Sequence, residues 1–212
     1  MQEENIKNIR EVLANKYPVP DTALNFETPF QLLIATILSA QTTDTQVNKV
    51  TSKLFDKYSS PQDFASLNKE KLEDEIHSIG LYRNKSKYII EASQKIIDDY
   101  SGEVPADFDE LLTLPGVGRK TASVVTYAAF SLPAFPVDTH VFRVSNRLGL
   151  ADSDNRDEVE FQLREVIPKD EWGDMHHRLI FHGREVCQAR NPRCYECSLR
   201  NYCQYFQQKE EE

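Results

Sequence analysis

The sequence has no hydrophobic run long enough to cross a bilayer. Its longest apolar stretch, residues 30–38, is interrupted by Gln31 and Thr36 and is far shorter than the roughly 20 residues of a membrane-spanning helix. The first four residues include Glu3 and Glu4, and they contain no hydrophobic region of a secretion signal. We therefore expect no membrane partner and a cytoplasmic location.

Cysteine is absent from the first 186 residues. All four cysteines follow in a C-x6-C-x2-C-x5-C pattern formed by Cys187, Cys194, Cys197 and Cys203. Disulfides are rare in the cytoplasm, so these thiols need another explanation. A structural zinc site usually has two close pairs and this pattern has one, whereas a cubane iron-sulfur cluster takes one cysteine sulfur per iron. The pattern therefore favours a 4Fe-4S cluster, with zinc as the alternative.

The net charge of −9 counts mildly against a polyanionic partner. The charge is unevenly distributed, however, because residues 151–174 carry nine acids and three bases. Residues 176–203 instead contain five arginines against two glutamates, namely Arg178, Arg184, Arg190, Arg193 and Arg200 against Glu185 and Glu196. A basic face on an acidic molecule is therefore compatible with the sequence.

No segment shows the sustained two-residue alternation of a strand, and no internal repeat is present. Apolar residues recur instead at helical spacing, which predicts an all-α protein. We expect helices over residues 3–17, 29–40, 43–58, 85–100, 119–129, 139–148, 156–166 and 172–187, with two short helices between residues 61 and 78 and the end of another at 109–112. Residues 29–40 are apolar nearly all round and should be buried. In the 85–100 helix we expect Tyr88, Ile89, Ala92 and Ile96 to point inward.

The segment from Leu114 to Lys120 reads Leu-Pro-Gly-Val-Gly-Arg-Lys. Pro115 and the two glycines predict a tight turn between two helices, which makes a helix-hairpin-helix unit. Without side chains at Gly116 and Gly118, the backbone amides can approach a phosphate at the positive end of the following helix.

Lys120 falls in the first turn of the helix that follows the hairpin. The helix dipole disfavours an ammonium there, which favours the free amine that a nucleophile needs. A plain surface lysine is the alternative interpretation. Asp138, in front of Thr139, is likewise either an N-cap or a reactive carboxylate, or both.

Four segments, in this order, resemble the bacterial endonuclease III family of helix-hairpin-helix DNA glycosylases. They are Leu38-Ser39-Ala40-Gln41, Leu114 to Lys120, Val137 to Arg143 and the four-cysteine loop. The resemblance implies two helical domains flanking a DNA-binding cleft. One domain would span residues 22–132, with the helix-hairpin-helix at about 107–130. Residues 1–21 and 133–212 would form the other, which would hold a 4Fe-4S cluster.

The resemblance also implies an activity. Lys120 matches the nucleophile and Asp138 the catalytic carboxylate of a bifunctional glycosylase and AP lyase of base excision repair. Such an enzyme excises oxidised pyrimidines and cleaves the abasic site by β-elimination through a lysine Schiff base. The implied partner is double-stranded DNA containing oxidised pyrimidines or abasic sites, bound by a monomer associated with the nucleoid.

Further positions match DNA-contacting residues of the family. Gln41 and Leu81 match the residues that fill the gap left by an extruded nucleotide. Their plainer interpretations are a polar helix end and a leucine of a small satellite core. Gly116, Gly118, Arg119, His140 and Arg143 match other DNA contacts, while Ser39 and Asp44, with His140 nearby, match the base pocket. Leu112 departs from the pattern, because some relatives have an acidic residue there.

Three other functions compete with this one. A monofunctional adenine glycosylase would lack Lys120 and would carry a catalytic glutamate early in the chain, where this sequence reads Leu38-Ser39-Ala40-Gln41-Thr42. A non-catalytic helix-hairpin-helix protein would bind DNA without forming a covalent adduct. An iron-sulfur electron carrier would need no phosphate-binding hairpin.

Overall fold

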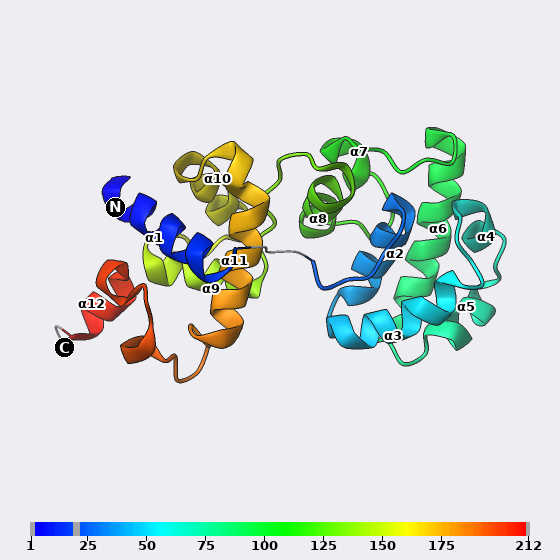
Figure 1. The fold of residues 1–212 in the computed structure, drawn as a ribbon. Helices are drawn as coiled ribbons and strands as arrows, with labels where there is room; N and C mark the ends of the chain where they lie inside the picture. The colour runs from blue at the N-terminus through cyan, green and yellow to red at the C-terminus, as the bar shows by residue number, and fades with distance from the viewer. Residues whose placement is uncertain (1–2, 19–21, 211–212) are drawn as a thin grey trace. The chain divides into compact units, whose positions relative to one another are not determined.

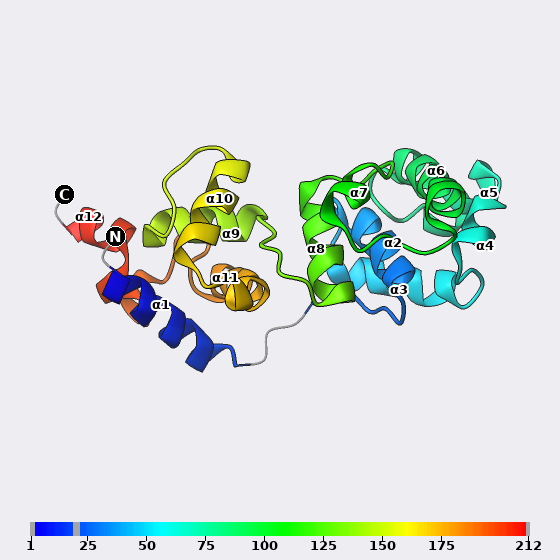
Figure 2. The same cartoon turned by 90° about the horizontal axis from the view of Figure 1, so that it is seen from above.

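The computed structural model describes residues 3–18 and 22–210. Residues 1–2, 19–21 and 211–212 lie outside this description. They include part of the acidic N-terminus, the three residues before the expected domain boundary between 21 and 22, and the last two glutamates. Every regular element of the described chain is a helix (Figures 1 and 2), so the all-α prediction is confirmed. No described helix has both the length and the apolar character that crossing a membrane requires.

The chain divides into two compact units. Residues 22–132, called here the central unit, contain α2 (Pro29–Ser39), α3 (Asp44–Phe55), α4 (Pro61–Ala65), α5 (Lys69–Ile76), α6 (Tyr82–Tyr100), α7 (Phe108–Leu112) and α8 (Arg119–Phe130). Residues 1–21 and 133–212, called here the terminal unit, contain α1 (Glu3–Lys16), α9 (Thr139–Leu148), α10 (Arg156–Val166), α11 (Trp172–Glu185) and α12 (Gln204–Glu210). The terminal unit also has short 3-10 helices at Lys169–Glu171, Cys194–Glu196 and Arg200–Tyr202.

Helix α2 forms the core of the central unit. Each residue from Phe30 to Leu38 is buried, as the all-round apolar sequence predicts. Thr28 caps the helix by accepting a hydrogen bond from the Gln31 amide at 3.2 Å, and Pro29 takes the first helical position. Helices α3, α6 and α8 pack around α2 (Figure 2). The unit therefore has a single core around a helix whose residues 30–38 are all buried.

Helix α6 differs from the expectation in two ways. It begins at Tyr82, three residues before the expected start. Ile89, Ala92 and Ile96 are buried as predicted, but the prediction for Tyr88 is wrong because its side chain is 40% exposed. The inward position one turn before Ile89 belongs to Lys85, which is only 4% exposed. The buried face repeats every three to four residues, and Tyr88 lies about 100° around the helix from Ile89.

The terminal unit is built on α11. Helices α1 and α9 pack against it, and α10 and α12 pack against α9 (Figure 1). Helices α9 and α10 have the predicted bounds, while α11 ends at Glu185, two residues before Cys187. Arg178 is 8% exposed and donates hydrogen bonds to the Tyr17 carbonyl and to Asp174. This arginine therefore does not contribute to the expected basic face.

Candidate active site and cysteine cluster

A six-residue turn joins α7 to α8 and completes the helix-hairpin-helix unit. Leu114 and Val117 are buried, and the Val117 amide donates to the Leu114 carbonyl at 3.1 Å. Gly116 and Gly118 are exposed. The hairpin therefore anchors its apolar residues in the core and presents its glycine backbone to solvent.

The two glycines of the hairpin have different roles. Gly116 has a φ of +78°, and a β-carbon there would lie 2.7 Å from Cβ of Tyr88. Gly118 has an extended backbone with a φ of −97°, and a β-carbon there would have no heavy atom within 4 Å. Gly116 is therefore required by the fold of the hairpin, whereas at Gly118 the protein itself has room for a side chain.

Gly118 is the N-cap of α8 and offers no side-chain oxygen to the first amides of that helix. Those amides are therefore left uncapped, which suits an anion such as a phosphate. Arg119 and Lys120 follow as the first two residues of α8, and both are exposed. The Arg119 guanidinium lies 5.2 Å from the ring centre of Phe108 in α7. The hairpin thus combines free amides, a cation and an accessible amine.

Asp138 is the N-cap of α9, in the terminal unit. Its Oδ1 accepts hydrogen bonds from the amides of His140 and Val141, both at 2.8 Å. The capping interpretation is therefore confirmed. Both bonds end on the same oxygen, which leaves Oδ2 outside the cap. The carboxylate is half-buried, so capping and a second role are compatible.

Arg143 ties α9 to α11 and to the start of the cysteine loop. Its guanidinium donates to the carbonyls of Gly183 at 3.0 Å, Cys187 at 3.1 Å and Thr139 at 3.3 Å. A β-carbon at Gly183 would lie 3.1 Å from both Arg143 and His140. These contacts engage Arg143 within the protein, so its role as a DNA contact stays a prediction.

His140 lies one helical turn before Arg143 and is half-buried. An Arg143 nitrogen lies 3.2 Å from its Nδ1. Burial is the largest effect on the ring and lowers the pKa of His140, while Asp138 opposes that change. The lowered pKa favours a neutral His140 ring near neutral pH.

Gln41 and Leu81 lie at two exposed tips of the central unit. Leu81 is 55% exposed, so its interpretation as a satellite-core residue is wrong. Both residues have left-handed backbones, with φ of 57° for Gln41 and 58° for Leu81. A β-carbon at Gly80 would lie 3.4 Å from the Gln41 carbonyl oxygen, so the two tips lie next to each other. A left-handed backbone costs stability at a residue that has a β-carbon, and such strain concentrates at functional sites.

The two expected base-pocket residues also lie in the central unit. Ser39 is half-buried at the end of α2 and donates its hydroxyl to the Thr36 carbonyl at 2.8 Å. Asp44 is the first residue of α3, directly after its cap Thr43, and is half-buried as well. Their role in a base pocket stays a prediction.

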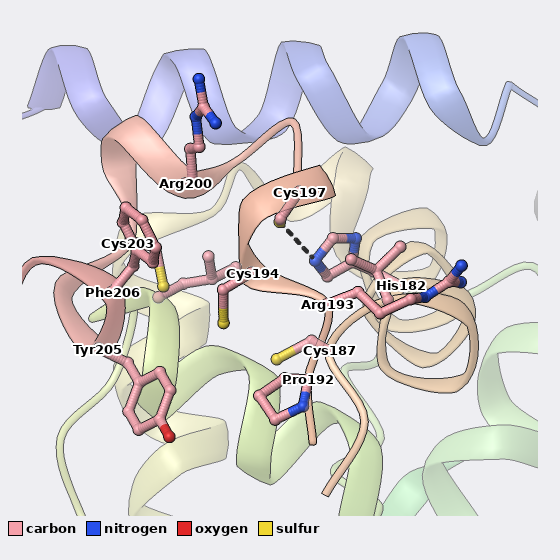
Figure 3. Close-up of a pocket in the computed structure, with 12 residues that line it drawn as sticks. His182, Cys187, Pro192, Arg193, Cys194, Cys197, Arg200, Cys203, Tyr205 and Phe206 are labelled. Atoms are coloured by element: carbon pink, nitrogen blue, oxygen red, sulfur yellow. Dashed lines mark hydrogen bonds between the residues drawn. The ribbon is translucent and has the colours of Figure 1, made fainter. Parts of the chain in front are cut away.

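The four cysteines line one cavity in the terminal unit (Figure 3). Cys187, Cys194 and Cys203 point into this space, and Cys197 Sγ lies 3.5 Å from His182 Nε2. The cysteines form no disulfide. Burial raises the pKa of the Cys197 and Cys203 thiols. Within the described ranges, no three His, Cys, Asp or Glu side chains are grouped as ligands of a single metal ion.

Arg147 of α9 bonds to the start of the cysteine loop. Its Nη1 lies 3.5 Å from Cys187 Sγ and donates to the Gln188 carbonyl, while its Nη2 donates to the Ala189 carbonyl. The Arg147 carbonyl in turn accepts from Cys203 Sγ at 3.3 Å. This arginine therefore links the first and last thiols of the loop to α9.

Sequence reasoning missed three residues beside these sites: Lys85, Arg147 and His182. The signal for Lys85 was present, because a lysine stands in the register of Ile89, Ala92 and Ile96 on a core face. Burial lowers the pKa of His182 to about 4, and its Nδ1 has no hydrogen-bond partner in the described chain. No local pattern distinguishes either Arg147 or His182, because their contacts are made by tertiary packing.

Comparison with known proteins decides the family. Residues 34–169 match the family described as HhH-GPD superfamily base excision DNA repair protein. Endonuclease III of Bacillus subtilis (strain 168) is 49% identical over 97% of this chain and 96% of that protein. The chain belongs to the endonuclease III family. Endonuclease III of Escherichia coli (strain K12) is 46% identical over 91% of this chain and 92% of that protein.

Solved structures of endonuclease III agree with the fold in both units. A non-covalent endonuclease III–DNA complex has a TM-score of 0.94 and 47% identity, with complete coverage of both chains. A trapped endonuclease III–DNA covalent intermediate, an estranged-adenine complex, has a TM-score of 0.94 and 48% identity over 99% of each chain. A thermostable thymine-DNA glycosylase has a TM-score of 0.88 and 26% identity over 97% of this chain and 98% of that one.

Proposed function

We propose that this protein is a bifunctional DNA glycosylase and AP lyase that removes oxidised pyrimidines in base excision repair. The observation that carries the proposal is Lys120, exposed in the first turn of α8 directly behind an exposed glycine hairpin. The similarity to an endonuclease III trapped covalently on DNA supports it. Neither a monofunctional glycosylase nor a DNA-binding module needs an amine at this position.

The lysine supplies the chemistry that cleavage requires. Its neutral amine attacks C1′ of the damaged nucleotide, and the bond between C1′ and the base breaks. The sugar ring opens to a Schiff base, which makes the C2′ proton acidic. Removal of that proton expels the 3′ phosphate, so the strand is cut by β-elimination. Water then hydrolyses the Schiff base and returns the amine.

Asp138 assists through the oxygen that the helix cap leaves unused. Oδ2 takes the proton that the attacking amine loses, and its negative charge stabilises the positive charge that develops on the sugar. Oδ1 meanwhile keeps its bonds to the two amides of α9 and fixes the carboxylate. The cap therefore orients the reactive group.

The hairpin and the two tips hold the DNA in this proposal. The uncapped amides of α8, with Gly116, Gly118 and Arg119, bind backbone phosphates next to the lesion. Gln41 and Leu81 enter the duplex and occupy the gap left by the extruded nucleotide. Exposure and left-handed backbones at both tips support this assignment. Ser39 and Asp44 of the central unit contact the extruded base in this proposal.

Four cysteines would hold a 4Fe-4S cluster in the terminal unit. The donor set fits, because four thiols line a single cavity that no carboxylate lines. Arg193 and Arg200 line the same cavity, but their guanidinium groups donate to the carbonyls of Glu185 and Tyr195, so Arg147, whose Nη1 lies 3.5 Å from Cys187 Sγ, is the cation nearest a thiol. When bound, such a cluster crosslinks a loop that has only two short 3-10 helices of its own. The purified protein should be brown and contain about four irons per chain, whereas stoichiometric zinc would contradict the assignment.

Borohydride trapping tests the catalytic proposal. We expect the wild type to crosslink to a duplex with one thymine glycol when borohydride reduces the Schiff base. Lys120→Ala should abolish the crosslink, while Lys49→Ala, which removes another exposed lysine of the central unit, should leave it unchanged. A crosslink that survives Lys120→Ala would reject the assigned nucleophile.

The substrate also suggests where and how the protein works. Chromosomal DNA lies in the cytoplasm of a bacterium, so an enzyme of this kind works there in association with the nucleoid. We expect a monomer, whose mass in light scattering should be close to the 24.4 kDa of one chain. A mass near twice that value would contradict this expectation.

A further inference from the structure

Lys85 is a buried cation of the central unit. Its side chain lies on the core face of α6 and is 4% exposed. The ammonium donates hydrogen bonds to the carbonyls of Leu38 at 2.8 Å and Ala40 at 2.6 Å, and to Thr42 Oγ1 at 3.4 Å. An ammonium has three N–H donors, so these acceptors use all of them. A lysine is rarely buried with neutral partners only and no carboxylate, which calls for a specific reason.

The two carbonyl acceptors belong to the C-terminal end of α2. The last carbonyls of a helix have no partner within the helix and carry the negative end of its dipole. A glycine usually ends such a helix in the left-handed conformation. Here Ala40 is the cap, and the left-handed residue that follows is Gln41, whose β-carbon disfavours that conformation. Lys85 therefore bonds to the residues on both sides of Gln41, Ala40 and Thr42.

The same lysine is connected to the second tip. Its backbone amide donates to the Leu81 carbonyl at 3.1 Å and closes the first turn of α6. Leu81 is the N-cap of that helix, has a left-handed backbone and makes no side-chain cap hydrogen bond. Lys85 thus binds the Gln41 segment through its side chain and the Leu81 segment through its backbone.

We infer that Lys85 is a positioning residue that locks the Gln41 and Leu81 tips together, so that both enter the duplex as one unit. The inference rests on the proposed function, because it assumes that these tips replace the extruded nucleotide. Lys85 touches neither the lesion nor Lys120 in this assignment. Its loss should impair nucleotide extrusion and leave the chemistry of Lys120 intact.

The decisive experiment compares two substrates. Lys85→Met keeps the length of the side chain and removes the three donors. We expect excision of thymine glycol from duplex DNA to fall by roughly 10- to 100-fold, the scale expected for misplaced groups. Cleavage of a preformed abasic site in single-stranded DNA, which needs no extrusion, should stay within about twofold. An equal loss on both substrates would overturn the inference.

The matched control is Lys87→Met, two residues further along α6. Lys87 is exposed and pairs with Glu91 at 3.8 Å, so its loss should change neither activity. Failure of the proposed function can be distinguished from failure of this inference. In that case borohydride would crosslink the wild type to neither substrate. Thermal melts of each variant report folding separately. If Lys85→Met does not fold, Thr42→Val removes one acceptor and should reduce duplex activity alone.

A combined variant tests whether Lys85 acts through the tips. With Gln41→Ala and Leu81→Ala present, the tips lack the side-chain atoms beyond Cβ that would enter the duplex. Lys85→Met should then cause no further loss of duplex activity, because the effects are not independent. Fluorescence of 2-aminopurine opposite the lesion should likewise change less on binding of Lys85→Met than on binding of the wild type. An additional loss in the combined variant, or an unchanged fluorescence response in Lys85→Met, would show that Lys85 does not act through the tips.

Discussion

Gly116 lies directly against Tyr88, where a β-carbon on the glycine would come within 2.7 Å of the tyrosine Cβ. The contact joins the hairpin to the exposed side of α6. It also explains why the prediction that Tyr88 points inward was wrong, since the ring lies beside the hairpin and remains 40% exposed. Gly116 is therefore needed for the fold of the hairpin, whereas Gly118 leaves the first amides of α8 accessible to a ligand.

We predict that Gly116→Ala and Gly118→Ala separate these two uses. Gly116→Ala should lower the free energy of unfolding by roughly 1–3 kcal/mol, because the alanine meets both Tyr88 and a positive φ. Gly118→Ala should cost less than about 1 kcal/mol, since its β-carbon points into open space. It should instead weaken DNA binding, because the new methyl group keeps phosphate away from the α8 amides. Chemical denaturation and fluorescence anisotropy measure the two effects.

Asp138→Asn should separate capping from catalysis. Asparagine caps helices as well as aspartate does, so the melting temperature should change little. Strand cleavage should fall by roughly 10²- to 10⁴-fold, because the amide cannot accept the proton of the lysine amine. Asp138→Ala is the comparison, and it should in addition lose about 1 kcal/mol of stability. An asparagine variant with full activity would leave Asp138 with a structural role only.

Leu81→Gly should be at least as stable as the wild type. A left-handed backbone costs a residue with a β-carbon about 1–2 kcal/mol. Glycine removes that cost, but it loses about 0.4–1 kcal/mol through the greater freedom of the unfolded chain. The Leu81 side chain is 55% exposed and contributes little to the core. Excision from duplex DNA should nevertheless fall, and an unchanged rate would remove Leu81 from the DNA interface.

The ion pair between Arg10 and Glu171 should make the terminal unit sensitive to acid. The Arg10 guanidinium donates to both Glu171 oxygens, with Nε to Oε2 at 2.9 Å, and this hydrogen bonding lowers the pKa of Glu171 below its usual value. The stabilisation is complete above the unfolded-state pKa of about 4.3 and is lost as pH falls through the lower folded-state pKa. Because the pair is partly exposed, it contributes about 1 kcal/mol or less.

Glu171→Gln should therefore reduce the decrease in the free energy of unfolding that occurs as pH falls below 5. The neutral amide does not ionise, so its interaction with Arg10 does not strengthen as pH rises. The variant should therefore have a lower free energy of unfolding than the wild type at pH 7, and this difference should shrink at low pH. Glu165→Gln, at an exposed position of α10, is the control and should follow the wild-type curve. A constant offset between Glu171→Gln and wild type at every pH would contradict this account.

Local patterns predicted most of the elements. The bounds of α9 and α10, the burial of α2 and the turn at Gly116 follow from spacing, caps and glycine, which act within a few residues. The capping role of Asp138 belongs to the same class. The grouping of the four cysteines was also visible in the sequence, because they lie within seventeen consecutive positions.

The positions of other side chains depended on contacts between distant segments. Lys85 bonds to carbonyls 45 and 47 residues earlier, and Arg143 to carbonyls 40 and 44 residues later. Leu81 looked like a core residue and is exposed, whereas Arg178 looked like a surface residue and is buried. Hydrophobicity and charge give the average preference of a residue, and packing can override it.

The sequence by itself determined which stretches form helices and indicated the candidate reactive residues, because covalent spacing and backbone preferences are local. Only the tertiary structure decided that two strained tips lie side by side and that a buried ammonium holds the end of α2. The physical reason is that a charge can be buried only where hydrogen-bonding partners or opposite charges surround it, and here those partners come from a distant segment. That convergence is a property of the folded chain and not of any short segment.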